Sequence, residues 1–312
     1  MKTSEVLIRR LGLPIVRRLP DSILRRSACR YYVEGADTNA IEVMKFFRQR
    51  AINPTFDILG ESVSDDGLCQ KNKEDYKNLI INVSQEAFLY RQSNYGNTPK
   101  DYDPQISIKL SMLGLLPGDA GNSFYFTQNL VTEILDEAKD HKIFVRIDME
   151  DSRFTDDTLI MYENLRDKGF ENVGIVLQSR LRRTQKDLER LIALEPDIRL
   201  VKGAYHNESY DKIFSDCQDV NDSYMDLVCK IISHDIPIEI ATMDQELIEN
   251  SMIFIGSYKR DNNRDPLFCF SMLYGARNDE LFRLAKAKIP TRVYIPYGTW
   301  ERAKAYAFRR FD

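Results

Sequence analysis

The sequence predicts an α/β protein built as a (β/α)8 TIM-type barrel. Three observations support this fold: apolar runs of strand length recur along the chain, a polar residue lies near one end of most runs, and helical patterns separate them. A doubly wound open sheet is the alternative, but no Gly-x-Gly-x-x-Gly turn follows any expected strand. The eight expected strands are Phe56–Leu59, Ile106–Leu113, Ile143–Glu150, Val173–Gln178, Ile198–Tyr205, Ile238–Asp244, Leu267–Leu273 and Val293–Gly298.

The region before the first strand is an N-terminal extension of residues 1–50, which leaves 51–312 for a catalytic barrel. A helical pattern around Val43, Phe46 and Phe47 falls in this extension. The chain has 312 residues, whereas a typical barrel has roughly 250. The residues beyond the length of a typical barrel are enough to form a few added helices.

Residues 1–30 form a basic arm, with eight Lys or Arg side chains against two acidic ones. Interleaved Leu, Ile and Val suit peripheral contact with an anionic membrane surface, although Pro14 and Pro20 interrupt a single helix. Short helices whose arginines pair with the acidic barrel are an equal alternative, and a mitochondrial transit peptide is a weaker one. We therefore expect a cytoplasmic protein with peripheral contact at the inner membrane face as an option.

Composition excludes several classes of function. The net charge of −4 argues against nucleic acid as a partner, and no apolar stretch reaches the ~18 residues that span a membrane. The five cysteines include no Cys-x-x-Cys, and the three histidines lack the spacing of a ligand set. We expect no metal site, disulfide framework or histidine triad.

The helices of the barrel have recognisable ends. Thr127 is an expected cap before an apolar face that begins at Leu130. The stretch 184–187 fits a capping box, in which a Thr and an acidic residue three positions later satisfy the first backbone N–H groups. Gly169 is an expected stop for a helix that starts near Thr155. Strand and helix therefore alternate as a barrel requires.

The segment Ile198–Tyr205 is a buried strand that ends in charged and aromatic residues. Arg199 and Lys202 are unusual there, because a strand buried on both faces is normally aliphatic. Active sites of barrels lie at the carboxyl ends of their strands, so this end predicts chemistry. An ordinary strand with solvated salt bridges is the plain alternative.

The C-terminal helix carries a second cluster of polar groups. Residues three and four apart share a helical face, so Tyr306, Arg309 and Arg310 point together. Neighbouring guanidinium groups favour a carboxylate or phosphate guest. The alternative is a basic helix end that the helix dipole stabilises.

At this point the chain resembles the proline dehydrogenase family of flavoenzymes. The resemblance runs from about Thr55 to Arg310 and rests on F-D-I-L-G-E-S-V-S, I-S-I-K-L-S, D-M-E-D, G-I-V-L-Q, R-L-V-K-G-A-Y, F-S-M-L-Y-G and Y-I-P-Y-G followed by Y-x-x-R-R. Seven motifs in order are very specific. The family implies a distorted barrel whose last helix lies over the barrel mouth.

The resemblance implies L-proline as substrate and assigns its binding groups. Arg309 and Arg310 would hold the carboxylate with Lys109 nearby, and Asp148 would pair with one of these arginines. Tyr294 would crowd a hydroxyl on C4 and so favour proline over 4-hydroxyproline. The residues expected to pack around the ring are Tyr205, Leu273, Tyr294 and Tyr306.

The resemblance also implies a flavin. Gln178 and Arg199 match positions around the isoalloxazine ring, and the positions around the ribityl and phosphate groups are Lys202, Gly203, Ala204 and Thr242. FAD is expected, with FMN as an option for two reasons. Met243 stands where the family usually has His, and the chain ends two residues after Arg310, where relatives continue this helix.

The implied reaction is hydride transfer from C5 of unprotonated proline to flavin N5, giving Δ1-pyrroline-5-carboxylate with a quinone as final acceptor. Three other classes stay open. A Schiff-base barrel enzyme would use Lys109 or Lys202 as nucleophile. A folate-reducing flavoprotein would not require the two C-terminal arginines, and a non-catalytic descendant would bind ligand without reducing a flavin.

Overall fold

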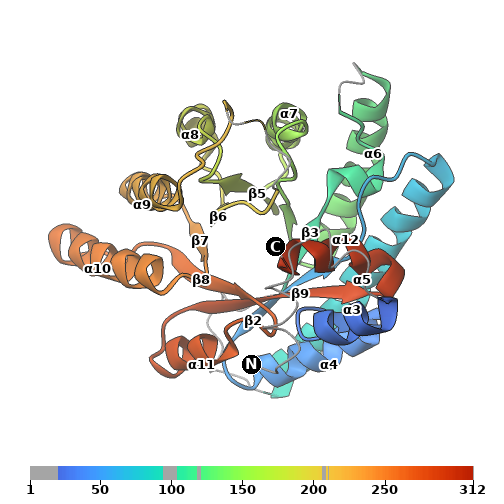
Figure 1. Ribbon diagram of the computed structural model, residues 1–312, viewed down its shortest axis with the longest axis horizontal. Helices are drawn as coiled ribbons and strands as arrows, with labels where there is room; N and C mark the ends of the chain where they lie inside the picture. The colour runs from blue at the N-terminus through green and yellow to red at the C-terminus, as the bar shows by residue number, and fades with distance from the viewer. Residues whose placement is uncertain (1–19, 94–103, 118–120, 206–208, 210, 312) are drawn as a thin grey trace.

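The computed structural model describes residues 20–93, 104–117, 121–205, 209 and 211–311, and they form a closed parallel barrel (Figure 1). The strand β9 closes the barrel because it pairs with both β8 and β2. A short strand, β1 (Val33–Glu34), pairs only with β9 in the described sheet. The eight barrel strands are β2 (Asn53–Ile58), β3 (Gln105–Ile108), β4 (Phe144–Ile147), β5 (Val173–Gln178), β6 (Ile198–Val201), β7 (Ile238–Ala241), β8 (Phe268–Leu273) and β9 (Thr291–Gly298). The predicted fold class is confirmed.

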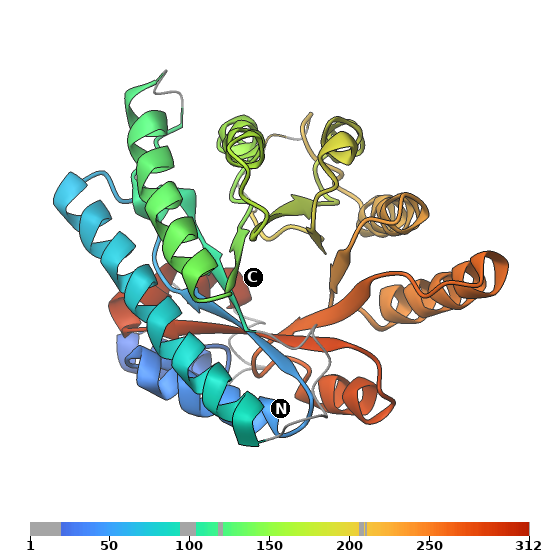
Figure 2. The same cartoon turned by 180° about the vertical axis from the view of Figure 1, so that it is seen from behind.

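Helices follow the strands and surround the barrel, as the two opposite views show (Figures 1 and 2). They are α5 (Asp66–Ser93), α6 (Asn122–Asp140), α7 (Thr155–Asp167), α8 (Thr184–Leu191), α9 (Cys217–Ser233), α10 (Gln245–Asn262), α11 (Asn278–Lys286) and α12 (Trp300–Phe311), with 3₁₀ turns η2 (Leu110–Leu113) and η3 (Ile192–Leu194). The helices α5 to α11 cover the strands with an apolar face, whereas the apolar residues of α12 belong to a second cluster shared with α3 (Asp21–Ala28), and this is the reason that their sequences repeat with a helical period.

The strands alternate between an aliphatic outer face and a polar inner face. On β3, Ile106 and Ile108 belong to the apolar core, while Ser107 contacts Arg199 of β6 across the barrel. Successive side chains of a strand point to opposite faces, so this alternation places polar groups inside. The barrel interior therefore carries chemistry instead of the usual layers of branched aliphatics.

The N-terminal elements pack on the end of the chain. The helix α4 (Asp37–Arg48) covers β2 and β9, and α3 (Asp21–Ala28) packs on α12 through a second apolar cluster that includes Leu24 and Trp300. Arg25 of α3 pairs with Glu34, which belongs to the same N-terminal extension and not to the barrel. Residues 1–19 of the basic arm lie outside the described residues. In the described part of the chain, no helix has the length and apolarity that a membrane span requires.

Several predicted boundaries are wrong, although the elements exist. The strand expected over Ile106–Leu113 ends at Ile108 and continues as η2, and the one expected to reach Tyr205 ends at Val201. Thr127 lies inside α6, where its Oγ1 donates to the Leu113 carbonyl instead of capping a helix. The cap of α8 is Arg183, with no side-chain hydrogen bond, so the capping box is also wrong. The stop at Gly169 is confirmed by its left-handed φ of +86°.

Candidate active site

A cavity of about 430 Å³ lies at the carboxyl ends of the strands, beside α12. Its wall includes strand ends from most of the barrel and three residues of the last helix. Every residue that the sequence predicted for substrate or cofactor lines it: Lys109, Asp148, Gln178, Arg199, Lys202, Gly203, Ala204, Tyr205, Thr242, Leu273, Tyr294, Tyr306, Arg309 and Arg310. The structure thus brings these residues together, and their individual roles remain predictions.

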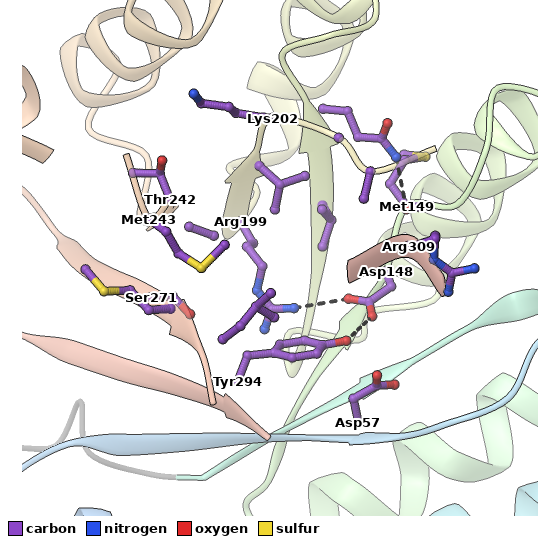
Figure 3. Close-up of a pocket in the computed structure, with 18 of the residues that line it drawn as sticks. Asp57, Asp148, Met149, Arg199, Lys202, Thr242, Met243, Ser271, Tyr294 and Arg309 are labelled. Atoms are coloured by element: carbon purple, nitrogen blue, oxygen red, sulfur yellow. Dashed lines mark hydrogen bonds and ion pairs between the residues drawn. The ribbon is translucent and has the colours of Figure 1, made fainter. Parts of the chain in front are cut away.

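Arg199 is the buried cation at the centre of the cavity wall (Figure 3). Its Nε donates to Glu239 Oε1 at 2.8 Å, and one terminal nitrogen donates to Ser107 Oγ at 2.9 Å and Asp148 Oδ1 at 3.1 Å. Burial opposes its charge, but Glu239 and Asp148 outweigh burial and raise the pKa of Arg199. The guanidinium group is therefore permanently charged and committed to acceptors within the protein.

Asp148 links Arg199 to Tyr294. Its Oδ2 accepts a hydrogen bond of 2.6 Å from the Tyr294 hydroxyl, and the Arg199 guanidinium lies 5.1 Å from the centre of the Tyr294 ring (Figure 3). The prediction that Asp148 pairs with Arg309 or Arg310 is wrong. The reason is position: Asp148 follows β4 and meets Arg199, which projects inward from β6, and Lys109, which follows β3.

Lys109 lies at the same level and forms an ion pair with Asp57 of β2. The Asp148 carboxylate lies 3.8 Å from its Nζ. Burial favours neutral Lys109, but the two carboxylates outweigh burial and raise its pKa. Since a Schiff-base nucleophile needs a lowered lysine pKa, this environment argues against the lysine-barrel alternative at Lys109.

Arg199 belongs to a group of four charged side chains in the barrel interior. This group, called the floor cluster, consists of Arg146, Arg199, Glu239 and Arg292. The Glu239 carboxylate contacts Arg199 at 2.8 Å, Arg146 at 3.6 Å and Arg292 at 3.9 Å. Burial opposes ionisation of Glu239, yet the three arginines outweigh burial and lower its pKa to about 2. A single carboxylate therefore lies within 3.9 Å of three guanidinium groups inside the barrel.

The helix α12 supplies the rim, defined here as Tyr306, Arg309 and Arg310. Arg309 forms an ion pair of 2.8 Å with Glu61, and its guanidinium lies 5.2 Å from the Tyr205 ring centre. Arg310 lies 5.2 Å from the Tyr306 ring centre, and its buried Nε has no hydrogen-bond partner among the described residues. An unsatisfied buried donor of a cation is costly, so this position favours an anionic guest.

At the other end of the cavity, the loop after β6 turns sharply beside Gln178. The Gln178 Nε2 donates to the carbonyls of Met149 and Glu150 at 3.0 and 2.8 Å, which fixes its amide. Gly203 has φ of +110°, and an added Cβ would lie 2.8 Å from Gln178 Oε1. Only glycine fits this position without a displacement of Gln178.

Lys202 pairs with Asp244 at 2.6 Å, and the Thr242 hydroxyl accepts from the Asp244 amide. Met243, between them, is 38% exposed, and its carbonyl accepts from Arg277. The polar groups at this end of the cavity are thus Lys202, Thr242 and Gln178, with no carboxylate except the partner of Lys202 among the lining residues here. Such a donor set suits a polar, anionic portion of a ligand.

Sequence reasoning missed Asp57, Glu61, Ser271 and the three residues around Arg199 in the floor cluster. The sequence signal that identifies these residues is a polar side chain at every second position of a strand. In the strand segments N-P-T-F-D-I, F-V-R-I-D and I-E-I-A, polar residues alternate with apolar ones. Because alternate residues of a strand share one face, this pattern predicts that the polar residues point together toward the barrel interior.

A family model described as proline dehydrogenase matches residues 40–312. "Proline dehydrogenase 2" of Bacillus subtilis (strain 168) is 31% identical over 274 residues, which cover 88% of this chain and 82% of the relative. The proline dehydrogenase of Deinococcus radiodurans is 30% identical over 286 residues, which cover 91% and 86%.

Solved structures of proline utilization A share the fold. The enzyme from Bdellovibrio bacteriovorus, inactivated by N-propargylglycine, superposes with a TM-score of 0.81 at 19% identity. A mutant of the Bradyrhizobium japonicum protein gives 0.74 at 23% identity. They align with 100% and 98% of this chain, but the chain spans only 35% and 32% of their length. The family model and the two named relatives together show that this chain belongs to the proline dehydrogenase family.

Proposed function

We propose that this protein oxidises L-proline to Δ1-pyrroline-5-carboxylate, the first step of proline catabolism, with a bound flavin. The observation that carries the proposal is the rim, where Arg310 lines a cavity shared with Tyr294 and Leu273 and its buried Nε has no hydrogen-bond partner among the described residues. A small ring with one carboxylate needs an anchored cation and apolar walls. In a chain of this family, that guest is proline.

Arg310 would bind the proline carboxylate, and Arg309, the preceding residue of α12, would add a second cation. The guanidinium of Arg309 already pairs with Glu61, so Arg310 is the stronger candidate for the direct contact. Arg offers two parallel donors to a carboxylate, which fixes orientation as well as distance. Holding the carboxylate at the rim would keep the ring carbon C5 at one depth in the cavity.

Tyr294, Tyr306, Tyr205 and Leu273 would surround the ring. Burial raises the pKa of Tyr306 to about 12, and burial with Asp148 raises that of Tyr294, so both phenols stay neutral at physiological pH. The Tyr294 hydroxyl is held by Asp148 at 2.6 Å and so cannot turn away from a substituent on C4 without losing that bond. We propose a preference for proline over 4-hydroxyproline on this basis.

The residues at the far end of the cavity fit a flavin. The cradle at Gly203 keeps a Cβ out of the space beside Gln178, and Lys202 and Thr242 provide the donors that a ribityl and phosphate chain requires. When bound, the flavin would accept the hydride from C5 of proline at its N5. Gln178, Arg199, Lys202, Gly203, Ala204 and Thr242 would hold it.

Arg199 would contribute positive charge more than hydrogen bonds. Its donors go to Glu239, Ser107 and Asp148, which accept from it inside the protein. FAD is the proposed cofactor, with FMN as the alternative because Met243 provides no ring nitrogen near the phosphate end. Mass spectrometry of the cofactor released by heat distinguishes the two.

We also propose a quinone as electron acceptor, reached by a cytoplasmic protein that contacts the membrane periphery through residues 1–30. The basic composition of that arm supports the contact. Arg25 opposes it in part, because its guanidinium pairs with Glu34 of the protein itself. Sedimentation with anionic vesicles, with and without residues 1–19, tests this part alone.

The central test is an anaerobic visible spectrum of the purified protein before and after L-proline. Bleaching of the yellow flavin band is expected, since a flavin that accepts a hydride loses this absorption. A yellow protein that proline leaves unchanged would refute proline oxidation. A protein that stays colourless after addition of FAD or FMN would refute the cofactor.

A further inference from the structure

Glu239 lies in the barrel interior below the cavity and does not line it. It pairs in register with Arg199, since β6 and β7 are neighbours and Arg199 and Glu239 face each other. Its side chain is 2% exposed. A buried carboxylate at such depth carries a large desolvation cost, so its presence requires an explanation.

Three arginines keep Glu239 charged. Arg199, Arg146 and Arg292 reach it from β6, β4 and β9, so the contacts converge from three sides of the barrel. Arg146 has a further carboxylate partner in Asp197, whereas the Glu239 carboxylate is the common partner of all three. Without it, three buried cations would repel one another across the interior.

The contact with Glu239 also sets the orientation of Arg199. The guanidinium is planar, so fixing Nε on Glu239 fixes the directions of its other donors. Those donors reach Ser107 at 2.9 Å, Asp148 at 3.1 Å and Thr55 at 3.5 Å on three other strands. Of the two carboxylates that contact Arg199, Glu239 is closer and more deeply buried than Asp148.

This orientation is transmitted to the cavity wall. Asp148 accepts from Arg199 on Oδ1 and from Tyr294 on Oδ2, and the Arg199 guanidinium also lies against the Tyr294 ring. A shift of Arg199 would therefore move Asp148 and Tyr294 together. The chain of contacts from Glu239 to the Tyr294 hydroxyl is continuous (Figure 3 shows its upper part).

We infer that Glu239 is a positioning residue for the proline pocket, which acts through Arg199 on Asp148 and Tyr294 and offsets the positive charge beneath the cofactor. This inference rests on the proposed function. It assigns two separable effects to one side chain: geometry, through the contact with Nε, and charge, through the field of the carboxylate.

Two variants separate these effects. Glu239→Asp keeps the charge but is one methylene shorter, so we expect kcat to fall roughly ten- to hundredfold with the KM for proline unchanged, because the rim is intact. Glu239→Gln keeps the length and removes the charge. We expect it to bind reduced flavin more tightly relative to oxidised flavin by about tenfold, an upward shift of about 30 mV for a two-electron couple.

The control is Asp187→Asn on α8, a buried carboxylate that pairs with Arg183 away from the cavity. Flavin potential is measured against a reference dye, independently of turnover, and thermal unfolding is recorded for each variant. A merely structural Glu239 would lower stability in both Glu239 variants, as the control substitution does, and leave kcat and potential at wild-type values. That result would overturn the inference while the wild type still reacts with proline, whereas a wild type that proline does not reduce would refute the proposed function itself.

Discussion

The floor cluster and the rim carry similar side chains but differ in their charged partners and in their access to the cavity. In the floor, three arginines share Glu239, and Arg199 also contacts Asp148. The buried Arg146 Nε and Glu239 Oε2 also lack hydrogen-bond partners in the described structure, but neither residue lines the cavity. In the rim, Arg309 has the partly exposed Glu61 as its partner, and Arg310 keeps a buried Nε with no partner in the described structure. The floor comes from strands inside the barrel, whereas the rim comes from one helix.

The difference indicates which charges hold the site together and which bind the guest. A cation whose acceptors belong to the protein gains little from a ligand, because the ligand would have to displace them. A cation with an unsatisfied donor gains a full charge-assisted hydrogen bond. We therefore expect floor substitutions to act mainly on stability and geometry, and rim substitutions to act mainly on proline binding.

The largest effect should come from Lys109→Met, which leaves the buried Asp57 without its cation, while Asp148 keeps Arg199. Removing one partner of a buried ion pair costs about 3–5 kcal/mol, so the free energy of unfolding should fall by that amount. Urea denaturation at pH 7 measures it. Arg310→Met is the matched rim variant and should lose less than about 1 kcal/mol. Equal losses in the two variants would abolish the distinction between the paired charges inside the barrel and the charges of the rim.

Acid should weaken the floor through Glu239. Its pKa is about 2 in the folded protein and 4.5 in the ordinary range, so its charge contributes stability that is present above pH 4.5 and is lost as the pH falls towards 2. The contribution is on the order of 3 kcal/mol. The stability advantage of wild type over Glu239→Gln should therefore shrink between pH 5 and pH 2. A pH-independent difference would show that Glu239 does not titrate as inferred.

The rim should show its effect in substrate binding. Arg310→Ala removes the unsatisfied donor, and we expect proline binding to weaken by about 1.5–3 kcal/mol with little change in unfolding. Titration of the flavin spectrum with proline gives the affinity. The control is Arg260→Ala on α10, where the arginine is exposed and does not line the cavity. Wild-type affinity in the Arg310 variant would exclude it from carboxylate binding.

The smallest expected effect lies outside both regions, at Gly203 in the loop after β6. In Gly203→Ala the new Cβ would displace Gln178, and we expect flavin affinity to fall by about tenfold, or ~1.4 kcal/mol. Gly169→Ala is the control: its φ is also positive, at +86°, but no atom lies within 4 Å of the added Cβ. If both variants bind flavin equally, the cradle has no part in cofactor binding.

The sequence predicted the fold well because a barrel depends on an alternation that each segment shows locally. All eight strands lie where apolar runs were found. Their ends were less certain: the run after Lys109 is apolar and buried, but Leu110–Leu113 forms a 3₁₀ turn. An apolar run of four residues does not distinguish a strand from a short buried turn.

Fourteen residues of the cavity were predicted, but their pairings were not. Asp148 was expected to contact the C-terminal arginines and contacts Arg199 instead. Partners across a barrel depend on the relative shift of the strands, which single segments do not encode. Glu239 was not predicted as an interior residue for a related reason. One acidic residue in I-E-I-A is indistinguishable from a surface charge until its neighbours from other strands are known.

The alternation of aliphatic and charged positions also specifies how the strands are aligned. If β7 slipped by one residue along β6, Glu239 would enter the aliphatic shell, and Ile238 or Ile240 would face the arginines. A slip of this kind exchanges the two faces of a strand completely. Each misaligned barrel would bury several unpaired charges at once. The charged interior therefore acts as a check on assembly, which excludes wrong alignments that an all-aliphatic barrel would tolerate.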